Sequence, residues 1–155
     1  RGRKGSMAAA APLCIAPLWI AARNGSVDAL WDLLEGGAVV DERAGPSAST
    51  PLHEASSCGL KPAVQLLLDK GAAVTAKDIA GRTPLHRAAI RHNTVVVQLL
   101  LERQAQVSAQ DDRGETPLRV AERGGHEDVV KILRAAEGRG SEATAVPNGP
   151  AMQGG

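Results

Sequence analysis

Residues Thr83-Pro84-Leu85-His86-Arg87-Ala88-Ala89 decide the fold, because the same sequence motif recurs once before them and once after them. The earlier copy is Thr50-Pro51-Leu52-His53-Glu54-Ala55, and the later copy is Thr116-Pro117-Leu118-Arg119-Val120-Ala121. The distance from Thr50 to Thr83 and from Thr83 to Thr116 is 33 residues each time. A fixed period of about this size is the signature of a stacked-repeat array. Threonine is a good helix N-cap and proline suits the first helical position, so each copy predicts the start of a short helix.

The motif and its period resemble those of the ankyrin repeat family. This resemblance implies an all-α fold, a solenoid of helix-turn-helix units with β-hairpin-like finger loops. In this family the histidine at the fourth position of the motif is structural and forms hydrogen bonds with neighbouring backbone, and the resemblance gives that role to His53 and His86. Small residues such as Ala55 and the Ala88-Ala89 pair let neighbouring helices approach closely, and a bulky side chain there is expected to overpack the contact.

Four repeats follow from the spacing. We place them at 16–43, 44–77, 78–110 and 111–137. The last repeat has Arg119 in place of the structural histidine, Glu122 in place of the second alanine and Arg134 in place of an apolar residue. A repeat array needs a polar closing unit where no neighbour covers it. We therefore expect an array of four repeats that is complete in itself.

The two ends of the chain are predicted to lie outside the array. Residues 1–15 form an N-terminal segment, expected to be flexible and partly foreign because Gly5-Ser6-Met7 is typical of a cloning junction. Its basic start and apolar run also fit a signal peptide, but Pro12 and Pro17 interrupt the run, and 16–25 aligns with 50–59. We interpret this aligned part as the first inner helix. The composition of 138–155, rich in Gly, Ser, Pro and Ala, predicts a disordered tail.

Composition narrows the class of protein. The 155 residues are 43% hydrophobic and carry a formal net charge of +1, which fits a globular chain and does not favour direct nucleic-acid binding. Aromatic residues make up 1%, so the interior must be thin and aliphatic, as a repeat array allows. Cys14 and Cys58 show no metal spacing and no disulfide framework, which favours a reducing compartment, the cytoplasm or the nucleus. No membrane association is expected.

Three positions depart from the repeat pattern in a way that matters for the backbone. His92 stands where most ankyrin repeats have glycine, and Gln104 stands where Gly37 and Gly71 stand in the earlier units. We expect His92 to adopt a positive φ at a cost of about 1 kcal/mol, and the joint at Gln104 to be less permissive. Asn93, which follows His92, is a candidate cap for the helix that begins after it.

No pattern for catalysis or metal binding is present. Histidines 53, 86, 92 and 126 are scattered without a second ligand three or four residues away, so zinc is not expected. Cys58 lies near His53 in sequence but has no orienting carboxylate, which favours a plain thiol over a nucleophile. We predict no enzyme, no cofactor and no small-molecule substrate. Ankyrin repeats are often hydroxylated on an asparagine, but the corresponding places here are Asp41, Thr75 and Ser108, and only Asp41 leaves the modification open.

What remains is a surface. Ankyrin family members generally hold another protein on the concave side, formed by inner helices and finger tips. Matching the variable places of the motif gives a set of candidate partner contacts: Arg23, Glu54, Ser57, Ile79, Arg82, Arg87, Ile90, Arg91, Arg113 and Arg123. The later half of this surface is basic, so our hypothesis is an adaptor or regulatory module, monomeric, that binds an acidic or mixed segment of a protein.

Other interpretations stay open. The arginines could form a solvated face with incidental charge. The chain could inhibit a protein kinase or another enzyme directly, as four-repeat inhibitors of cyclin-dependent kinases do, although 50–59 looks longer than their shortened second inner helix. It could also be a transcription-associated cofactor, with binding that weakens strongly as salt rises. On the opposite side of the array, Trp31 is either partly buried under the N-terminal segment or a contact residue of its own.

Overall fold

The computed structural model describes the backbone of residues 17–145 and the side chains of residues 18–138. Within that range the chain forms helices joined by turns and long loops, with no strand apart from one isolated bridge between Ala44 and Ser49. The helices are α2 Pro17–Asn24, α3 Val27–Glu35, α4 Pro51–Cys58, α5 Lys61–Asp69, α6 Pro84–Ile90, α7 Thr94–Glu102, α8 Pro117–Gly124 and α9 Glu127–Ala145.

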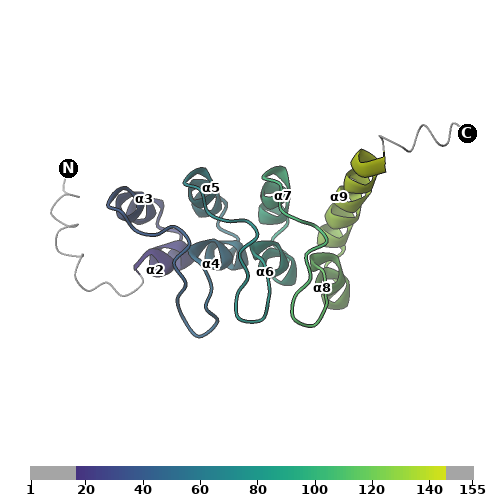
Figure 1. Ribbon diagram of the computed structural model, residues 1–155, viewed down its shortest axis with the longest axis horizontal. Coiled ribbons are helices and arrows are strands. Elements are labelled where there is room, and N and C mark those ends of the chain that lie inside the picture. The colour runs from purple at the N-terminus through teal and green to yellow at the C-terminus, as the bar shows by residue number, and fades with distance from the viewer. Residues whose placement is uncertain (1–16, 146–155) are drawn as a thin grey trace, which may run out of the picture.

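The helices stand in two layers (Figure 1). The inner layer is α2, α4, α6 and α8, the outer layer is α3, α5, α7 and α9, and finger loops project from below the inner layer. Each inner helix packs against its outer partner and against the next inner helix. This arrangement is the predicted all-α solenoid of helix-turn-helix units, and that prediction is confirmed.

The repeated motif starts inner helices, as expected. Thr50 accepts a hydrogen bond from the backbone N–H of His53, while the His53 ring accepts one from the Thr50 N–H. Thr83 and His86 repeat this reciprocal cap at the start of α6. At the start of α8, Thr116 accepts from the Arg119 N–H, and the reciprocal bond is lost because arginine offers no acceptor.

The core is a thin aliphatic seam between the two layers. Its largest fully buried side chains include Leu30, Leu67, Val97, Leu100 and Leu133, which come from the outer helices α3, α5, α7 and α9. Because each pair of helices hides its apolar side against the next pair, no single unit could bury this surface alone. The stack therefore depends on contacts between neighbouring repeats.

The predicted end of the array needs correction. The prediction ended the fourth repeat at residue 137 and began a disordered tail at 138, but α9 continues to Ala145. Once a helix is nucleated and packed, each further residue costs little, and Ala and Glu in this stretch are good helix formers despite two glycines. The predictions for 1–15 and for 146–155 lie outside the described residues.

Candidate functional site

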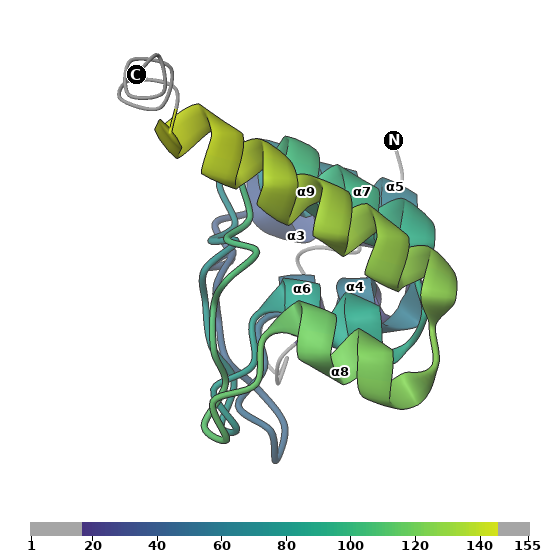
Figure 2. The same cartoon turned by 90° about the vertical axis from the view of Figure 1, so that its right-hand side faces the viewer.

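The fingers and the inner helices form the two walls of one surface (Figure 2). Neighbouring fingers are joined through their backbones: the Ile79 N–H donates to the Ser47 carbonyl at 2.9 Å, and the Asp112 N–H donates to the Ala80 carbonyl at 3.0 Å. The fingers therefore act as one continuous wall rather than as independent loops.

Each of the later fingers is shaped by an aspartate at its start. One carboxylate oxygen of Asp78 accepts from the backbone N–H groups of Ala80 and Arg82, both at 2.9 Å. Asp111 accepts from Arg113 and Glu115 in the same way. Burial by itself would raise the pKa of Asp78, but these N–H donors and the Arg87 guanidinium hold that pKa below its ordinary value.

The two structural histidines fasten the fingers to the helices. His53 is fully buried, and its Nε2 donates to the Arg82 carbonyl at 2.7 Å while its Nδ1 accepts from the Thr50 N–H. His86 is also fully buried, and its Nε2 donates to the Glu115 carbonyl at 2.8 Å. Burial lowers the pKa of His53 to about 4 and lowers that of His86 as well. Both rings are neutral and structural, as the family resemblance implied.

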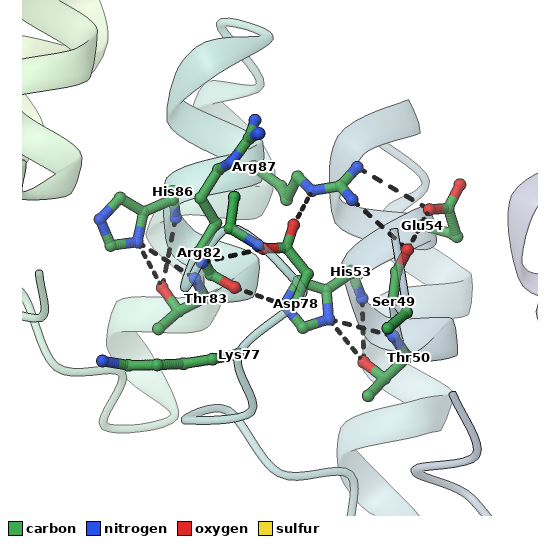
Figure 3. Close-up of polar contacts among 12 residues, drawn as sticks. Ser49, Thr50, His53, Glu54, Lys77, Asp78, Arg82, Thr83, His86 and Arg87 are labelled. Atoms are coloured by element: carbon green, nitrogen blue, oxygen red, sulfur yellow. Dashed lines mark hydrogen bonds and ion pairs between the residues drawn. The ribbon is translucent and has the colours of Figure 1, made fainter. Parts of the chain in front are cut away.

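Arg87 and Glu54, both expected to contact a partner, are engaged in contacts within the protein (Figure 3). The Arg87 guanidinium donates to Asp78 at 2.9 Å, donates to Ser49 at 3.4 Å and lies 3.8 Å from Glu54. Ser49 in turn donates to Glu54 at 2.9 Å. The side chains of Arg87, Asp78 and Glu54 are 15%, 1% and 12% exposed. The concave position of Arg87 was inferred from the motif, but three acceptors from repeats two and three surround it there.

Four other predicted residues converge on one hollow between the third and fourth repeats. Arg82, Ile90, Arg113 and Arg123 line a depression of about 220 Å³. The rest of its wall comes from the two fingers and α8: Ala80, Asp111, Asp112, Glu115 and Val120. Ile90 and Val120 supply an apolar base, and the charged side chains stand around it. We call this depression the finger hollow.

The charges around the finger hollow are only partly paired. Arg123 forms an ion pair with Glu115 across the wall. The side chains of Arg82 and Arg113 form no hydrogen bond or ion pair with the described residues. Asp112, exposed on the finger, is the acid left unpaired in this wall. The hollow therefore combines an aliphatic base with available guanidinium groups.

The remaining predicted residues lie apart from the finger hollow. Ile79 is 68% exposed on the preceding finger, and Arg91 is exposed where α6 ends. Ser57 is partly buried near the end of α4. Arg23 is exposed and lies over the ring of Trp19, 5.6 Å from its centre.

Sequence reasoning missed the role of Asn93. It stands at the N-cap position of α7, but its side chain makes no cap hydrogen bond. The amide instead donates to the carbonyls of Ser56 at 2.7 Å and Ser57 at 2.9 Å. His126, 33 residues later, likewise reaches back to the Ile90 carbonyl at 3.0 Å. This shared offset was the available signal, since both side chains satisfy carbonyls at the end of the preceding inner helix.

Nothing in the described part of the chain suggests other chemistry. Residues 18–138 hold no group of three or more His, Cys, Asp or Glu side chains that could bind a metal ion. None of the described helices is long and apolar enough to cross a bilayer. The second inner helix, α4, has eight residues, as α2 and α8 do, so it is not the shortened helix of the kinase inhibitors considered above.

Stacked helix pairs with joined finger loops define a repeat solenoid, a class that presents a long surface to other macromolecules. The family is shown directly by sequence: the model described as "Ankyrin repeats (3 copies)" matches residues 11–78 and 76–144. The chain belongs to the ankyrin repeat family, whose repeats are interaction modules that bind protein partners.

A curated relative shares part of this array. The BRCA1-associated RING domain protein 1 of Caenorhabditis elegans is 40% identical over 66 residues. The match covers 43% of this chain but only 9% of that protein, so the similarity is limited to a short stretch.

Proposed function

We propose that this chain is an adaptor or regulatory subunit that holds an acidic segment of a protein partner in the finger hollow. The observation that carries the proposal is the convergence of Arg82 and Arg113, whose side chains form no ion pair with the described residues, over the apolar base of Ile90 and Val120. Guanidinium groups bind carboxylates through paired hydrogen bonds, and arginine is enriched among residues that dominate binding energy.

Charge elsewhere on the surface favours the same site. Arg87 is neutralised within the protein by Asp78 and Glu54, and Arg123 is held by Glu115. The cations left for a partner are therefore concentrated at the third and fourth repeats, where Arg91 lies near the end of α6. A segment that pairs one or two carboxylates with an aliphatic side chain would match both parts of the hollow.

Nucleic acid fits this site less well. The formal net charge of the whole chain is only +1, and acids such as Asp112 and Glu115 stand among the arginines of the hollow. Phosphate backbones are recognised by extended rows of cations rather than by a hollow with an aliphatic base. A binding constant that falls about a thousandfold between low and moderate salt would indicate a polyanion instead of a protein segment.

The test compares two variants of the full chain. Arg82→Glu with Arg113→Glu reverses the free charges of the hollow, and Lys61→Glu with Lys131→Glu makes the same charge change at exposed side chains of α5 and α9, away from the hollow. Proteins captured from a lysate by the unaltered chain are identified, purified and measured by calorimetry. We expect the first variant to bind the genuine partner about tenfold more weakly or worse, and the second to bind unchanged. Equal affinity of both variants for every partner would rule the site out.

A further inference from the structure

The outer helices are tied together by a regular series of ion pairs. Lys70, at the end of α5, lies 2.5 Å from Glu35 at the end of α3. Arg103, at the end of α7, lies 2.8 Å from Asp69 at the end of α5. In both cases a cation of one repeat meets the acid that ends the outer helix of the preceding repeat.

The series stops between the third and fourth repeats. Glu102 ends α7 as Glu35 ends α3 and Asp69 is the last residue of α5, so it is the next acid in line. The positions 34 and 35 residues later hold Ala136 and Glu137, neither of which is basic. Among the described side chains, Glu102 has no ion pair and no hydrogen bond. Within residues 18–138, its carboxylate is the one in this series that lacks a basic partner.

A hollow lies at the same place. Gln98, Leu101 and Glu102 of α7 and Ile132 and Ala135 of α9 enclose an open groove of about 580 Å³. At the two earlier joints the neighbouring outer helices are joined by the Lys70–Glu35 and Arg103–Asp69 ion pairs. Lys70 also covers the ring of Trp31 there, 4.0 Å from its centre. Within residues 18–138, the groove between α7 and α9 therefore has an apolar floor, an acid at its edge and no cation paired with that acid.

We propose that this groove is a second docking surface, which takes a lysine or arginine of a protein partner together with a neighbouring aliphatic side chain. The methylene stem of the basic residue lies along Leu101 and Ile132, and its charged head reaches Glu102, as Lys70 and Arg103 reach Glu35 and Asp69. The groove is large enough for more than one side chain, which is why an aliphatic neighbour belongs to the recognised segment.

Charge selects this occupant over the other classes. Glu102 lines the groove and a second acid, Glu137, follows two residues after Ala135 on α9, so a cationic group is favoured there over the phosphate groups of nucleic acid or of anionic lipid. The groove is lined by α7 and α9, whereas the finger hollow is lined by two fingers, α6 and α8. Figures 1 and 2 show α7 and α9 in the outer layer, and α6, α8 and the fingers on the other side of the array. The two surfaces are thus separate and prefer opposite charges, and this inference does not depend on the proposed function.

The test selects binding peptides without assuming their sequence. A phage library of random twelve-residue peptides is selected on the immobilised full chain, and enriched peptides are labelled with fluorescein and measured by anisotropy. Each peptide is titrated with the unaltered chain, with Glu102→Gln and with the matched control Glu127→Gln, an exposed acid at the start of α9. Thermal unfolding of the three chains shows that all are folded.

We expect a group of peptides whose affinity falls about fivefold with Glu102→Gln and not with Glu127→Gln. These peptides carry a lysine or arginine beside an aliphatic residue, and replacing that base by glutamine removes the dependence on Glu102. The inference is overturned when no enriched peptide depends on Glu102, or when the dependent peptides lack a base. A concentration-dependent dimer in sedimentation that Glu102→Gln abolishes would also overturn it, since the occupant would then be a second copy of this chain.

Discussion

Replacing Arg87 by methionine should destabilise the protein strongly, although Arg87 is on the side of the array that we propose binds partners. Methionine keeps much of the aliphatic stem and removes the guanidinium. The Asp78 carboxylate, 1% exposed, would keep two backbone donors and lose its charged one, and Glu54 would lose the cation beside it. Removing one partner of a largely buried ion pair costs about 3–5 kcal/mol, and the 15% exposure of Arg87 favours the lower end, about 3 kcal/mol.

The assay is urea unfolding of the full chain followed by far-ultraviolet circular dichroism. Arg91→Met is the matched control, because Arg91 is exposed one turn away on the same helix end and should change the unfolding free energy by less than about 0.5 kcal/mol. A double-mutant cycle of Arg87→Met with Asp78→Asn should show a coupling energy above about 1 kcal/mol. If Arg87→Met cost no more than Arg91→Met, or the coupling were absent, the network would not contribute as described.

Two further predictions concern pH and the backbone. Burial lowers the pKa of His53 to about 4. As the pH falls below about 6.5, the His53 ring therefore binds a proton in the unfolded chain but stays neutral in the folded chain. Stability is full above pH 6.5 and should fall as the pH drops from 6.5 toward 4, by about 3 kcal/mol for His53 and further for His86, measured as urea midpoints across that range. Separately, Gln104 has a φ of 71°, which glycine adopts without strain, so Gln104→Gly should raise the unfolding free energy by about 1 kcal/mol. A lower midpoint of thermal unfolding for this variant would contradict the prediction.

The backbone was predictable where the repeat offset carried the information. His92 and Gln104 align with glycines of other repeats, and their φ angles are 61° and 71°. At both positions the turn geometry is imposed by the stack rather than by the residue present. The helix starts were also predictable, because the threonine and proline of each motif act within the first turn of their own helix.

The candidate site was predictable only in part. The motif placed Arg82, Ile90, Arg113 and Arg123 on one surface, and the structure brings them together. The motif could not show that Arg87 is consumed internally, because its acceptors lie 9, 33 and 38 residues away in a finger, in α4 and in the loop before α4. The extent of α9 was also misjudged, since a composition rich in Gly and Ser was weighed above the helix propensity of the alanines and glutamates between them.

Offsets of 33 to 35 residues also explain which charges remain for recognition. Lys70 meets Glu35 and Arg103 meets Asp69 because acid and base recur in step, and such pairs join repeats rather than recruit partners. Charge is left over where the step is broken: at Glu102, because the positions 34 and 35 residues later hold Ala136 and Glu137 instead of a base.

The fingers follow the same rule. Ser47 and Ala80 give their carbonyls to the next finger, and the finger that carries Arg113 has no later finger among residues 17–145 to cover it. An array built from one repeated contact satisfies its interior and concentrates unmatched groups where the repetition changes. Both surfaces proposed for this protein involve the fourth repeat for that reason, and substitutions that restore the pattern there should weaken binding while leaving the stack intact.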